Sequence, residues 1–222
     1  MDSAVIFDVD GVLLDLTPAE EDGFFVPFAR RYGLTGLSRD WDSYRTRNDE
    51  DIIGEILERH GLPLTDRDAV IADYLAVMEE GLRLQRFSPV EIAGARDLLA
   101  SLSGTHGIGI ATANLLGAAR LRLAHAGLWP WVARFAFGAE GGGHKRETVA
   151  RAIAATGLAR SRIVYIGDNL NDVAAGLDNG VHFIGFAEDS GRRARLAEAG
   201  ALHTSGDHRT TRVLITRLLG AT

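Results

Sequence analysis

Four short, continuously apolar segments constrain the fold of this chain more than any other feature. They lie at residues 4–7 (AVIF), 107–112 (GIGIAT), 162–167 (RIVYIG) and 181–186 (VHFIGF). Apolar runs without polar alternation are typical of parallel strands that helices cover on both faces. Helical stretches at 116–128 and 145–158 separate the last three segments, and each has a Gly near its end. The repeated order of strand and helix predicts an α/β fold with a doubly wound, Rossmann-like parallel sheet.

Residues 16–86 depart from this pattern. Apolar residues recur there at three- and four-residue spacing, which predicts helices, in the stretches 20–34, 48–62 and 67–84. The stretch 86–92 (RFSPVEI) carries a Ser-Pro pair that favours an extended return linker. We therefore expect an inserted α-helical cap domain at 16–86 and an α/β core domain made of 1–15 and 87–222.

The overall composition argues against several classes of partner. The net charge is −6, from 24 Lys and Arg against 30 Asp and Glu, whereas nucleic acids and anionic membranes require a concentrated basic surface. No apolar run approaches the roughly 20 residues of a membrane span. The start of the chain lacks the basic region of a signal peptide, and the absence of cysteine fits a reducing compartment. We expect a cytoplasmic monomer or homodimer with no nucleic-acid and no membrane partner.

Acidic residues gather where the predicted strands end. Asp8 and Asp10 come directly after the first strand, Thr112 ends the second, and Asp168 follows the third. Ligands of open α/β sheets bind in the crevice outside the carboxyl ends of the strands, so these side chains are expected to converge there. Asp172 lies four residues after Asp168, which places both on one side of a first helical turn if a helix begins near residue 169.

Several carboxylates in one crevice require a cation. A hard divalent ion with oxygen ligands meets this need, and Mg²⁺ suits a site with few carboxylates, some waters and a phosphate oxygen. Beside such an ion, Asp8 is suited to be a nucleophile that forms an aspartyl phosphate. Asp10 would then act as general acid for the leaving group and as general base for water. Gly11 permits the tight chain reversal that aims both carboxylates at the crevice.

Four motifs in order carry a resemblance to a known family. They are an apolar strand followed by DVDGV at 8–12, an apolar strand ending in Thr112, a lone Lys145 before a helix, and an apolar strand followed by GDNLND at 167–172. This order resembles the haloacid dehalogenase-like superfamily over the whole chain. The helical insert looks like the C1 cap of its phosphoglycolate phosphatase-like and β-phosphoglucomutase-like members.

The resemblance implies roles for the residues around the first two strands. Asp8 would be the nucleophile and Asp10 the acid and base, with the Asp10 main-chain carbonyl as a metal ligand. Thr112 would hydrogen-bond the phosphoryl group. The expected phosphate-binding set is Gly11, Ala113 and Asn114.

The resemblance also implies roles for residues later in the chain. Lys145 would neutralise the charge that the nucleophile shares with the phosphate, although the usual Lys-Pro motif here reads Lys-Arg and leaves His144 and Arg146 as rivals. Asp168 would bind Mg²⁺ directly, whereas Asp172 would either bind it or order its waters and Lys145. The expected metal-binding set is Asp8, Asp10, Asp168 and Asp172.

The cap carries a cluster of polar residues that suggests a substrate contact. Arg45, Arg47 and Asn48 precede a predicted helix, in the region that contacts the leaving group in C1-capped relatives. A cation there would select an acidic or phosphorylated substrate, while the alternative is a solvated arginine pair.

These observations lead to a functional hypothesis with two alternatives. We expect a Mg²⁺-dependent phosphatase that hydrolyses a phosphate monoester of a small metabolite through an aspartyl phosphate. A sugar-phosphate mutase of the β-phosphoglucomutase type would use the same residues but return the phosphoryl group to its substrate. A non-catalytic binding module on the same fold is the remaining alternative.

Overall fold

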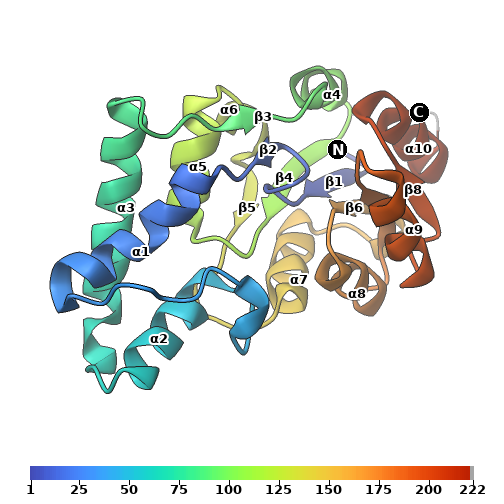
Figure 1. Ribbon diagram of the computed structural model, residues 1–222. Helices are drawn as coiled ribbons and strands as arrows, with labels where there is room; N and C mark the ends of the chain where they lie inside the picture. The colour runs from blue at the N-terminus through green and yellow to red at the C-terminus, as the bar shows by residue number, and fades with distance from the viewer. Residues whose placement is uncertain (221–222) are drawn as a thin grey trace.

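A six-stranded parallel sheet forms the centre of the protein (Figure 1). This computed structural model describes residues 1–220, and its strands follow the spatial order β5-β4-β1-β6-β7-β8. Their bounds are Ala4–Phe7 (β1), Gly107–Ala111 (β4), Phe135–Phe137 (β5), Ile163–Gly167 (β6), His182–Phe186 (β7) and His203–Ser205 (β8). Phe7 at the end of β1 pairs with Ile110 on one side and Ile166 on the other. Strands are added to the sheet on both sides of β1, so the strand order reverses there. The carboxyl ends of β1, β4 and β6 therefore lie next to one another at this topological switch point.

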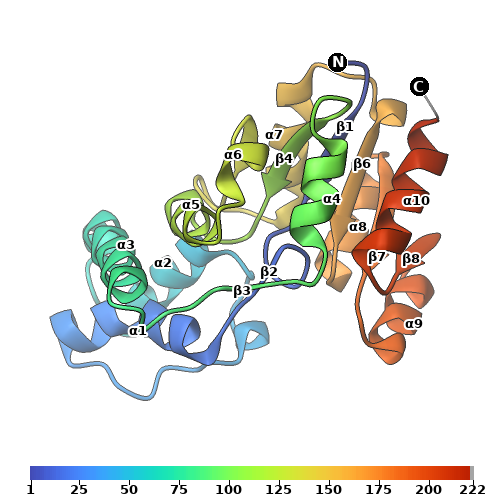
Figure 2. The same ribbon diagram turned by 90° about the horizontal axis from the view of Figure 1, so that it is seen from above.

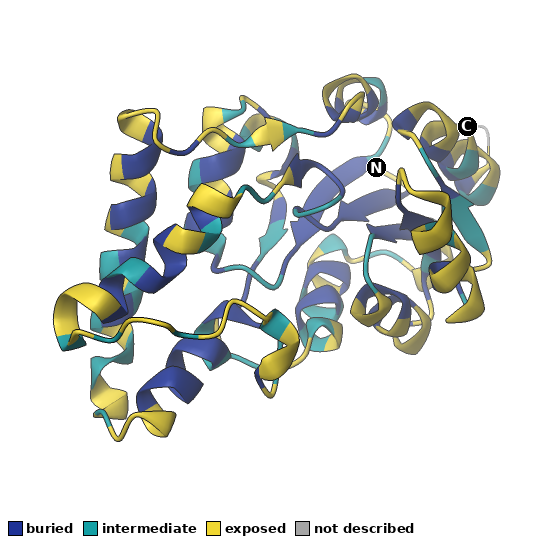
Figure 3. Cartoon of the chain, in the orientation of Figure 1, coloured by how far each residue is buried: buried dark blue, intermediate teal, exposed yellow. Residues whose placement is uncertain are grey.

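Helices cover both faces of this sheet (Figure 2). Val5 and Phe7 of β1 belong to an apolar cluster with α4, α5, α6 and α10, whereas Ala4 and Ile6 belong to a second cluster with α7, α8 and α9. The central strands β1, β4 and β6 are therefore buried on both sides (Figure 3), which explains their continuous apolar sequence. The helices are Ala95–Leu102 (α4), Leu116–His125 (α5), Trp129–Val132 (α6), Lys145–Thr156 (α7), Leu170–Asp178 (α8), Ser190–Glu198 (α9) and His208–Leu219 (α10), with a 3₁₀ turn at Arg160–Arg162.

The helical part between β1 and β4, called the cap below, is entered and left through a short antiparallel ribbon of β2 (Leu14–Asp15) and β3 (Val90–Glu91). It contains α1 (Pro18–Tyr32), α2 (Asp49–Arg59), α3 (Arg67–Arg83) and 3₁₀ turns at Trp41–Ser43 and Leu64–Asp66. A capping box starts α1, since the side chains of Thr17 and Glu20 each accept a hydrogen bond from the other's backbone N–H. The cap has its own apolar cluster, to which Leu115 and Ala118 beside the sheet also contribute.

The predicted fold class is confirmed, and all four predicted strands are present. The strands β5 and β8 at the two edges of the sheet were missed. Each has only three residues, and β8 (HTS) is polar, so neither shows the apolar run that identified the others. The domain bounds at 16–86 stay a prediction. Within residues 1–220 no helix has both the length and the apolar character needed to cross a membrane.

Candidate active site

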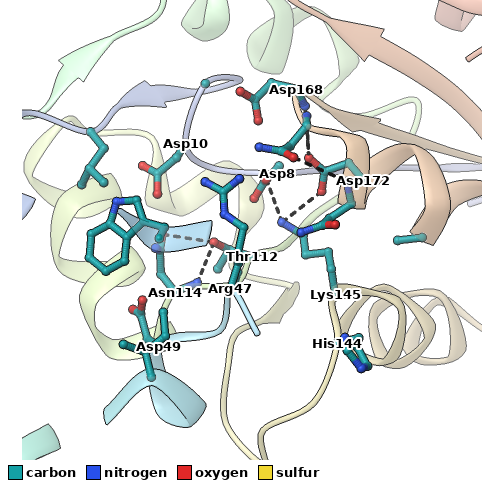
Figure 4. Close-up of a pocket in the computed structure, with 18 of the residues that line it drawn as sticks. Asp8, Asp10, Arg47, Asp49, Thr112, Asn114, His144, Lys145, Asp168 and Asp172 are labelled. Atoms are coloured by element: carbon teal, nitrogen blue, oxygen red, sulfur yellow. Dashed lines mark hydrogen bonds and ion pairs between the residues drawn. The ribbon is translucent and has the colours of Figure 1, made fainter. Parts of the chain in front are cut away.

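A cavity of about 620 Å³ lies between the cap and the carboxyl ends of β1, β4 and β6. Figure 4 shows that its labelled side chains come from loops after these strands, from the starts of α7 and α8 and from the cap. The core contributes Asp8, Asp10, Gly11, Thr112, Ala113, Asn114, Lys145, Asp168 and Asp172 to its lining. The expected convergence of these residues is therefore observed in the structure.

Asp8 and Lys145 form an ion pair at the base of this cavity. The Lys145 Nζ atom lies 2.7 Å from Asp8 Oδ2 and 3.2 Å from Asp172 Oδ1, and each of the three side chains is at most 10% exposed. The other Asp8 oxygen accepts the Val9 backbone N–H at 2.7 Å. His144 contacts neither carboxylate, and Arg146 is exposed and paired with Glu147, so the structure places Lys145 rather than either rival against Asp8 (Figure 4).

Asp172 is held by four donors. Its Oδ1 accepts from the Tyr165 hydroxyl at 2.5 Å and from Lys145, and its Oδ2 accepts the backbone N–H groups of Asp168 and Asn169. The bond from the Asn169 N–H belongs to a capping box at the start of α8, in which Asn169 is the N-cap residue and Asp172 lies in the first turn. Both oxygens are thus engaged within the protein, which fixes the carboxylate in place beside Lys145.

The acidic cluster fits a divalent cation. One carboxylate oxygen from each of Asp8, Asp168 and Asp172 lies within 4.8 Å of the others. Burial, followed by the nearby carboxylates, raises the pKa of Asp8 well above its usual value even though Lys145 opposes the shift. Burial and Asp172 likewise raise the pKa of Asp168 to about 6, against the effect of Arg192. Burial disfavours the charged form of these carboxylates. A hard cation such as Mg²⁺ bound to their oxygens would stabilise that charged form.

Arg192 is a site residue that the sequence did not reveal. Its Nη2 atom lies 2.6 Å from Asp168 Oδ2, although in sequence the run of arginines at the start of α9 has the pattern of a solvated helix face. The contact depends on the loop after β7 lying beside the loop after β6, and sequence spacing carries no signal of it.

Gly11 is required by two features of its position. Its φ of +71° lies in the left-handed region, and a Cβ atom there would lie 2.3 Å from Asp168 Oδ2. The glycine therefore allows the chain after β1 to turn directly against Asp168. This agrees with the expected reversal, while a phosphate contact by Gly11 stays a prediction.

Asp10 is held by a buried arginine on α5. The Arg122 Nη1 atom lies 2.7 Å from Asp10 Oδ1, and its Nε lies 2.8 Å from Oε1 of Glu20 in the cap. Its third donor reaches the Asp15 carbonyl at 3.1 Å. Arg122 is 2% exposed, and although burial lowers the pKa of its guanidinium, the two carboxylates outweigh that effect and raise it. Asp10 lines the cavity, and its Oδ2 has no hydrogen-bond donor among residues 1–220, so this oxygen is free to meet a ligand there.

The loop after β4 offers one unpaired amide to the cavity. The Thr112 hydroxyl accepts the Asn114 backbone N–H at 3.2 Å and donates to Asn114 Oδ1 at 3.1 Å. The Ala113 carbonyl accepts from the Asp49 backbone, whereas the Ala113 N–H has no acceptor in the part of the chain that the structure describes. Of the two amides predicted to bind phosphate, that of Ala113 is therefore unpaired.

The three cap residues proposed from the sequence are not brought together. Arg47 lines the cavity and lies 3.5 Å from Asp42. Arg45 faces a separate surface depression, where it pairs with Glu55 and Glu58. Asn48 caps α2 by accepting backbone N–H groups at 3.0 and 3.2 Å. The structure thus gives Arg45 and Asn48 other partners, and of the three only Arg47 lines the cavity.

An apolar and acidic wall of the cap faces the catalytic loops. It consists of Phe24, Trp41, Ile52 and Tyr74, together with Glu20, Glu21 and Asp49. Phe24 belongs to the apolar cluster of the cap and is also part of the wall. The sequence did not identify Asp49 as a site residue. An acid in the first turn of a helix is common, because the helix dipole stabilises its charge. Here burial raises the pKa of Asp49 to about 7, despite a hydrogen bond from Leu115.

Comparison with known proteins identifies the family of this chain. Residues 5–186 match the sequence profile of the family described as haloacid dehalogenase-like hydrolase. The protein belongs to this family, and the resemblance inferred from the four motifs is confirmed. Comparison with curated proteins gave no match.

Solved structures show the same fold over nearly the whole chain. A provisionally assigned β-phosphoglucomutase from Bacteroides vulgatus superposes with a TM-score of 0.71 at 18% identity, covering 99% of this chain and 91% of the other. A predicted phosphatase from Clostridium acetobutylicum has a TM-score of 0.69 at 19% identity, covering 96% and 99%. A haloacid dehalogenase family hydrolase from Deinococcus radiodurans, with bound phosphate and sodium, has a TM-score of 0.62 at 21% identity, covering 98% and 96%.

Proposed function

We propose that this hydrolase is a Mg²⁺-dependent phosphatase that cleaves a phosphate monoester of a small metabolite through an aspartyl phosphate at Asp8. The observation that carries the proposal is the ion pair of 2.7 Å between Lys145 and Asp8, set within the acidic cluster at the base of the cavity. A buried carboxylate with a fixed ammonium beside it is suited to attack an anionic phosphoryl group, since the ammonium offsets the negative charge that accumulates.

The remaining catalytic steps fall to residues around the same cavity. Asp8 Oδ2 would attack phosphorus, and Asp10 Oδ2, the oxygen open to the cavity, would give a proton to the departing oxygen. The same Asp10 oxygen would then take a proton from the water that hydrolyses the acyl phosphate. The Ala113 amide and the Thr112 hydroxyl would hydrogen-bond the phosphoryl oxygens, and the cap would exclude bulk water.

Asp8, Asp168 and the Asp10 carbonyl would hold Mg²⁺, which supplies charge neutralisation at the phosphoryl oxygens. The sequence left open whether Asp172 binds the ion directly or orders its surroundings. The four donors on Asp172 favour the second role, because they fill about all four lone-pair sites of its carboxylate, whereas Asp8 has a single donor on each oxygen. We therefore propose Asp172 as the residue that orients Lys145.

The proposed reaction takes a small phosphorylated metabolite, in a cytoplasmic monomer or homodimer. It is tested by phosphate release from a panel of phosphate monoesters, with and without Mg²⁺, for the wild type and Asp8→Asn. Metal-dependent release that disappears in Asp8→Asn supports the phosphatase. Isomer formation without net phosphate release would indicate the mutase, and the absence of both reactions with every ester would indicate a binding module.

A further inference from the structure

Asp49 places a buried and only partly paired carboxylate in the cap wall. It is the first residue of α2, is 8% exposed and lines the cavity. Its Oδ2 accepts the Leu115 backbone N–H at 2.9 Å, and its own N–H donates to the Ala113 carbonyl at 3.0 Å. No donor among residues 1–220 reaches its Oδ1. Figure 4 shows the carboxylate on the cap side of the cavity, near Asn114 and opposite the Asp8 and Lys145 pair.

Aromatic side chains line the cavity on the same side as Asp49. Trp41 and Tyr74 each meet Phe24 edge to face, with ring centroids 5.5 and 5.1 Å apart. The Trp41 indole N–H donates to Glu21 Oε1 at 3.2 Å, which fixes the ring and adds a second carboxylate to the wall. Aromatic faces next to carboxylates are a combination that attracts organic cations.

The cations on this side of the cavity are already paired. Arg122 is shared by the carboxylates of Asp10 and Glu20 at 2.7 and 2.8 Å. Arg47 lies 3.5 Å from Asp42. No hydrogen bond or ion pair among residues 1–220 therefore reaches Asp49 Oδ1, and a buried carboxylate oxygen without a partner is costly. Its pKa of about 7 is consistent with that lack of compensation.

We propose that Asp49 determines specificity by selecting phosphate esters whose leaving group carries a protonated amine next to an apolar or aromatic surface. This inference rests on the proposed phosphatase function and names the substrate class of the same site. The ammonium would donate to Asp49 Oδ1, and the rest of the leaving group would lie against Phe24, Trp41 and Tyr74. A leaving group with a second phosphate or a carboxylate would instead meet Asp49 and Glu21 and be repelled.

The test compares two esters of equal size, 4-(aminomethyl)phenyl phosphate and 4-(hydroxymethyl)phenyl phosphate. The quantity compared is the ratio of their kcat/KM values, in the wild type and in Asp49→Asn, where the Asn oxygen can still accept the Leu115 N–H. Because a hydrogen bond between charged partners exceeds a neutral one, we expect the ratio to favour the amine in the wild type and to fall about tenfold or more in the variant.

Asp51→Asn is the matched control. Asp51 lies in the same first turn and accepts the Gly143 backbone N–H at 2.9 Å, but it does not line the cavity. The variant removes an equal charge from the helix start and should keep the wild-type ratio. A drop in the ratio in Asp51→Asn as large as in Asp49→Asn would overturn the proposal, since a general charge effect would then explain both.

Calorimetric binding of the corresponding benzylphosphonates, which cannot be hydrolysed, tests the amine site separately from the proposed phosphatase activity. Tighter binding of the aminomethyl compound that requires Asp49, without hydrolysis of either ester, would support the amine site and overturn the phosphatase. Hydrolysis of both esters with a wild-type ratio that does not favour the amine, or with the same ratio in Asp49→Asn, would overturn the amine site and leave the phosphatase standing.

Discussion

The ammonium of Lys145 bridges Asp8 and Asp172, at 2.7 Å from the first carboxylate and 3.2 Å from the second. Burial alone would lower the pKa of Lys145, but the two carboxylates outweigh it and raise the pKa above its usual value. The lysine therefore keeps its proton around neutral pH, and it acts as a fixed charge rather than as an acid or base.

The first prediction concerns this fixed charge. Lys145→Ala should lower kcat/KM for any accepted phosphate ester by about 10²- to 10³-fold, the loss typical of removing one group that stabilises transition-state charge. Arg146→Ala is the matched control, because this neighbouring cation is exposed and paired with Glu147 and Asp178. It should change kcat/KM by no more than about twofold, since exposed ion pairs contribute little. Comparable losses in both variants would contradict the role assigned to Lys145.

The second prediction concerns metal affinity and pH. Asp168, with a pKa of about 6, carries a proton below that pH and must lose it when a cation binds. The apparent affinity for Mg²⁺ should therefore be nearly constant from pH 8 to 7 and fall below pH 6, by about tenfold per pH unit for each proton displaced. Calorimetric titrations at pH 5, 6, 7 and 8 measure this dependence.

Two variants make the metal prediction specific. Asp168→Asn should abolish Mg²⁺ binding, whereas Asp178→Asn should retain it, because Asp178 lines the same cavity but lies outside the acidic cluster. An affinity that does not change between pH 8 and pH 5 would show that Asp168 is not a ligand.

The sequence predicted those site residues whose positions follow from the local pattern of strands and helices. Asp8 and Asp168 follow buried strands directly, so their positions could be inferred from strand ends and parallel pairing alone. Arg122 and Asp49 could not be found in this way. Arg122 lies in the middle of α5 in a stretch without a motif, and its role depends on Glu20, 102 residues away. Asp49 resembles any acid at a helix start until the cap is placed over the loop at 113–115.

The same distinction applies to the cap residues. Arg45 and Arg47 are two residues apart and looked equivalent in sequence. They lie in a segment of bends between the 3₁₀ turn at Trp41–Ser43 and α2, where the chain direction changes and residue spacing does not fix the direction of the side chains. Only the packing of the cap decides that Arg47 lines the cavity while Arg45 pairs with Glu58 on another surface.

The third prediction separates backbone strain from a specific clash. Gly11→Ala and Gly33→Ala both place a Cβ on a residue with positive φ, +71° and +68°. Each should lose about 1–2 kcal/mol of stability from that conformation. Only the Cβ of Gly11→Ala meets Asp168, at 2.3 Å, whereas that of Gly33→Ala meets nothing within 4 Å. We therefore expect phosphate release to be lost in Gly11→Ala alone, with urea unfolding as the common stability measure. Equal activity in the two variants would show that close packing against Asp168 is unnecessary.

The fourth prediction concerns the buried arginine that joins core and cap. Arg122→Met leaves Glu20, which is 1% exposed, without its cation, and should cost about 3–5 kcal/mol of unfolding free energy. Adding Glu20→Gln to that variant removes the uncompensated buried charge, so the double variant should be more stable than Arg122→Met alone. Urea unfolding of the wild type, both single variants and the double variant gives the coupling energy between the two residues.

The coupling has a further consequence for catalysis. Arg122 holds Asp10 by one oxygen and leaves the other open to the cavity, so the double variant would restore stability without restoring the position of Asp10. We expect it to fold but to release phosphate more slowly than the wild type, with the loss in kcat rather than in KM, because the substrate's binding groups are untouched. A double variant with the wild-type kcat would show that Arg122 stabilises the contact between cap and core but does not position the acid.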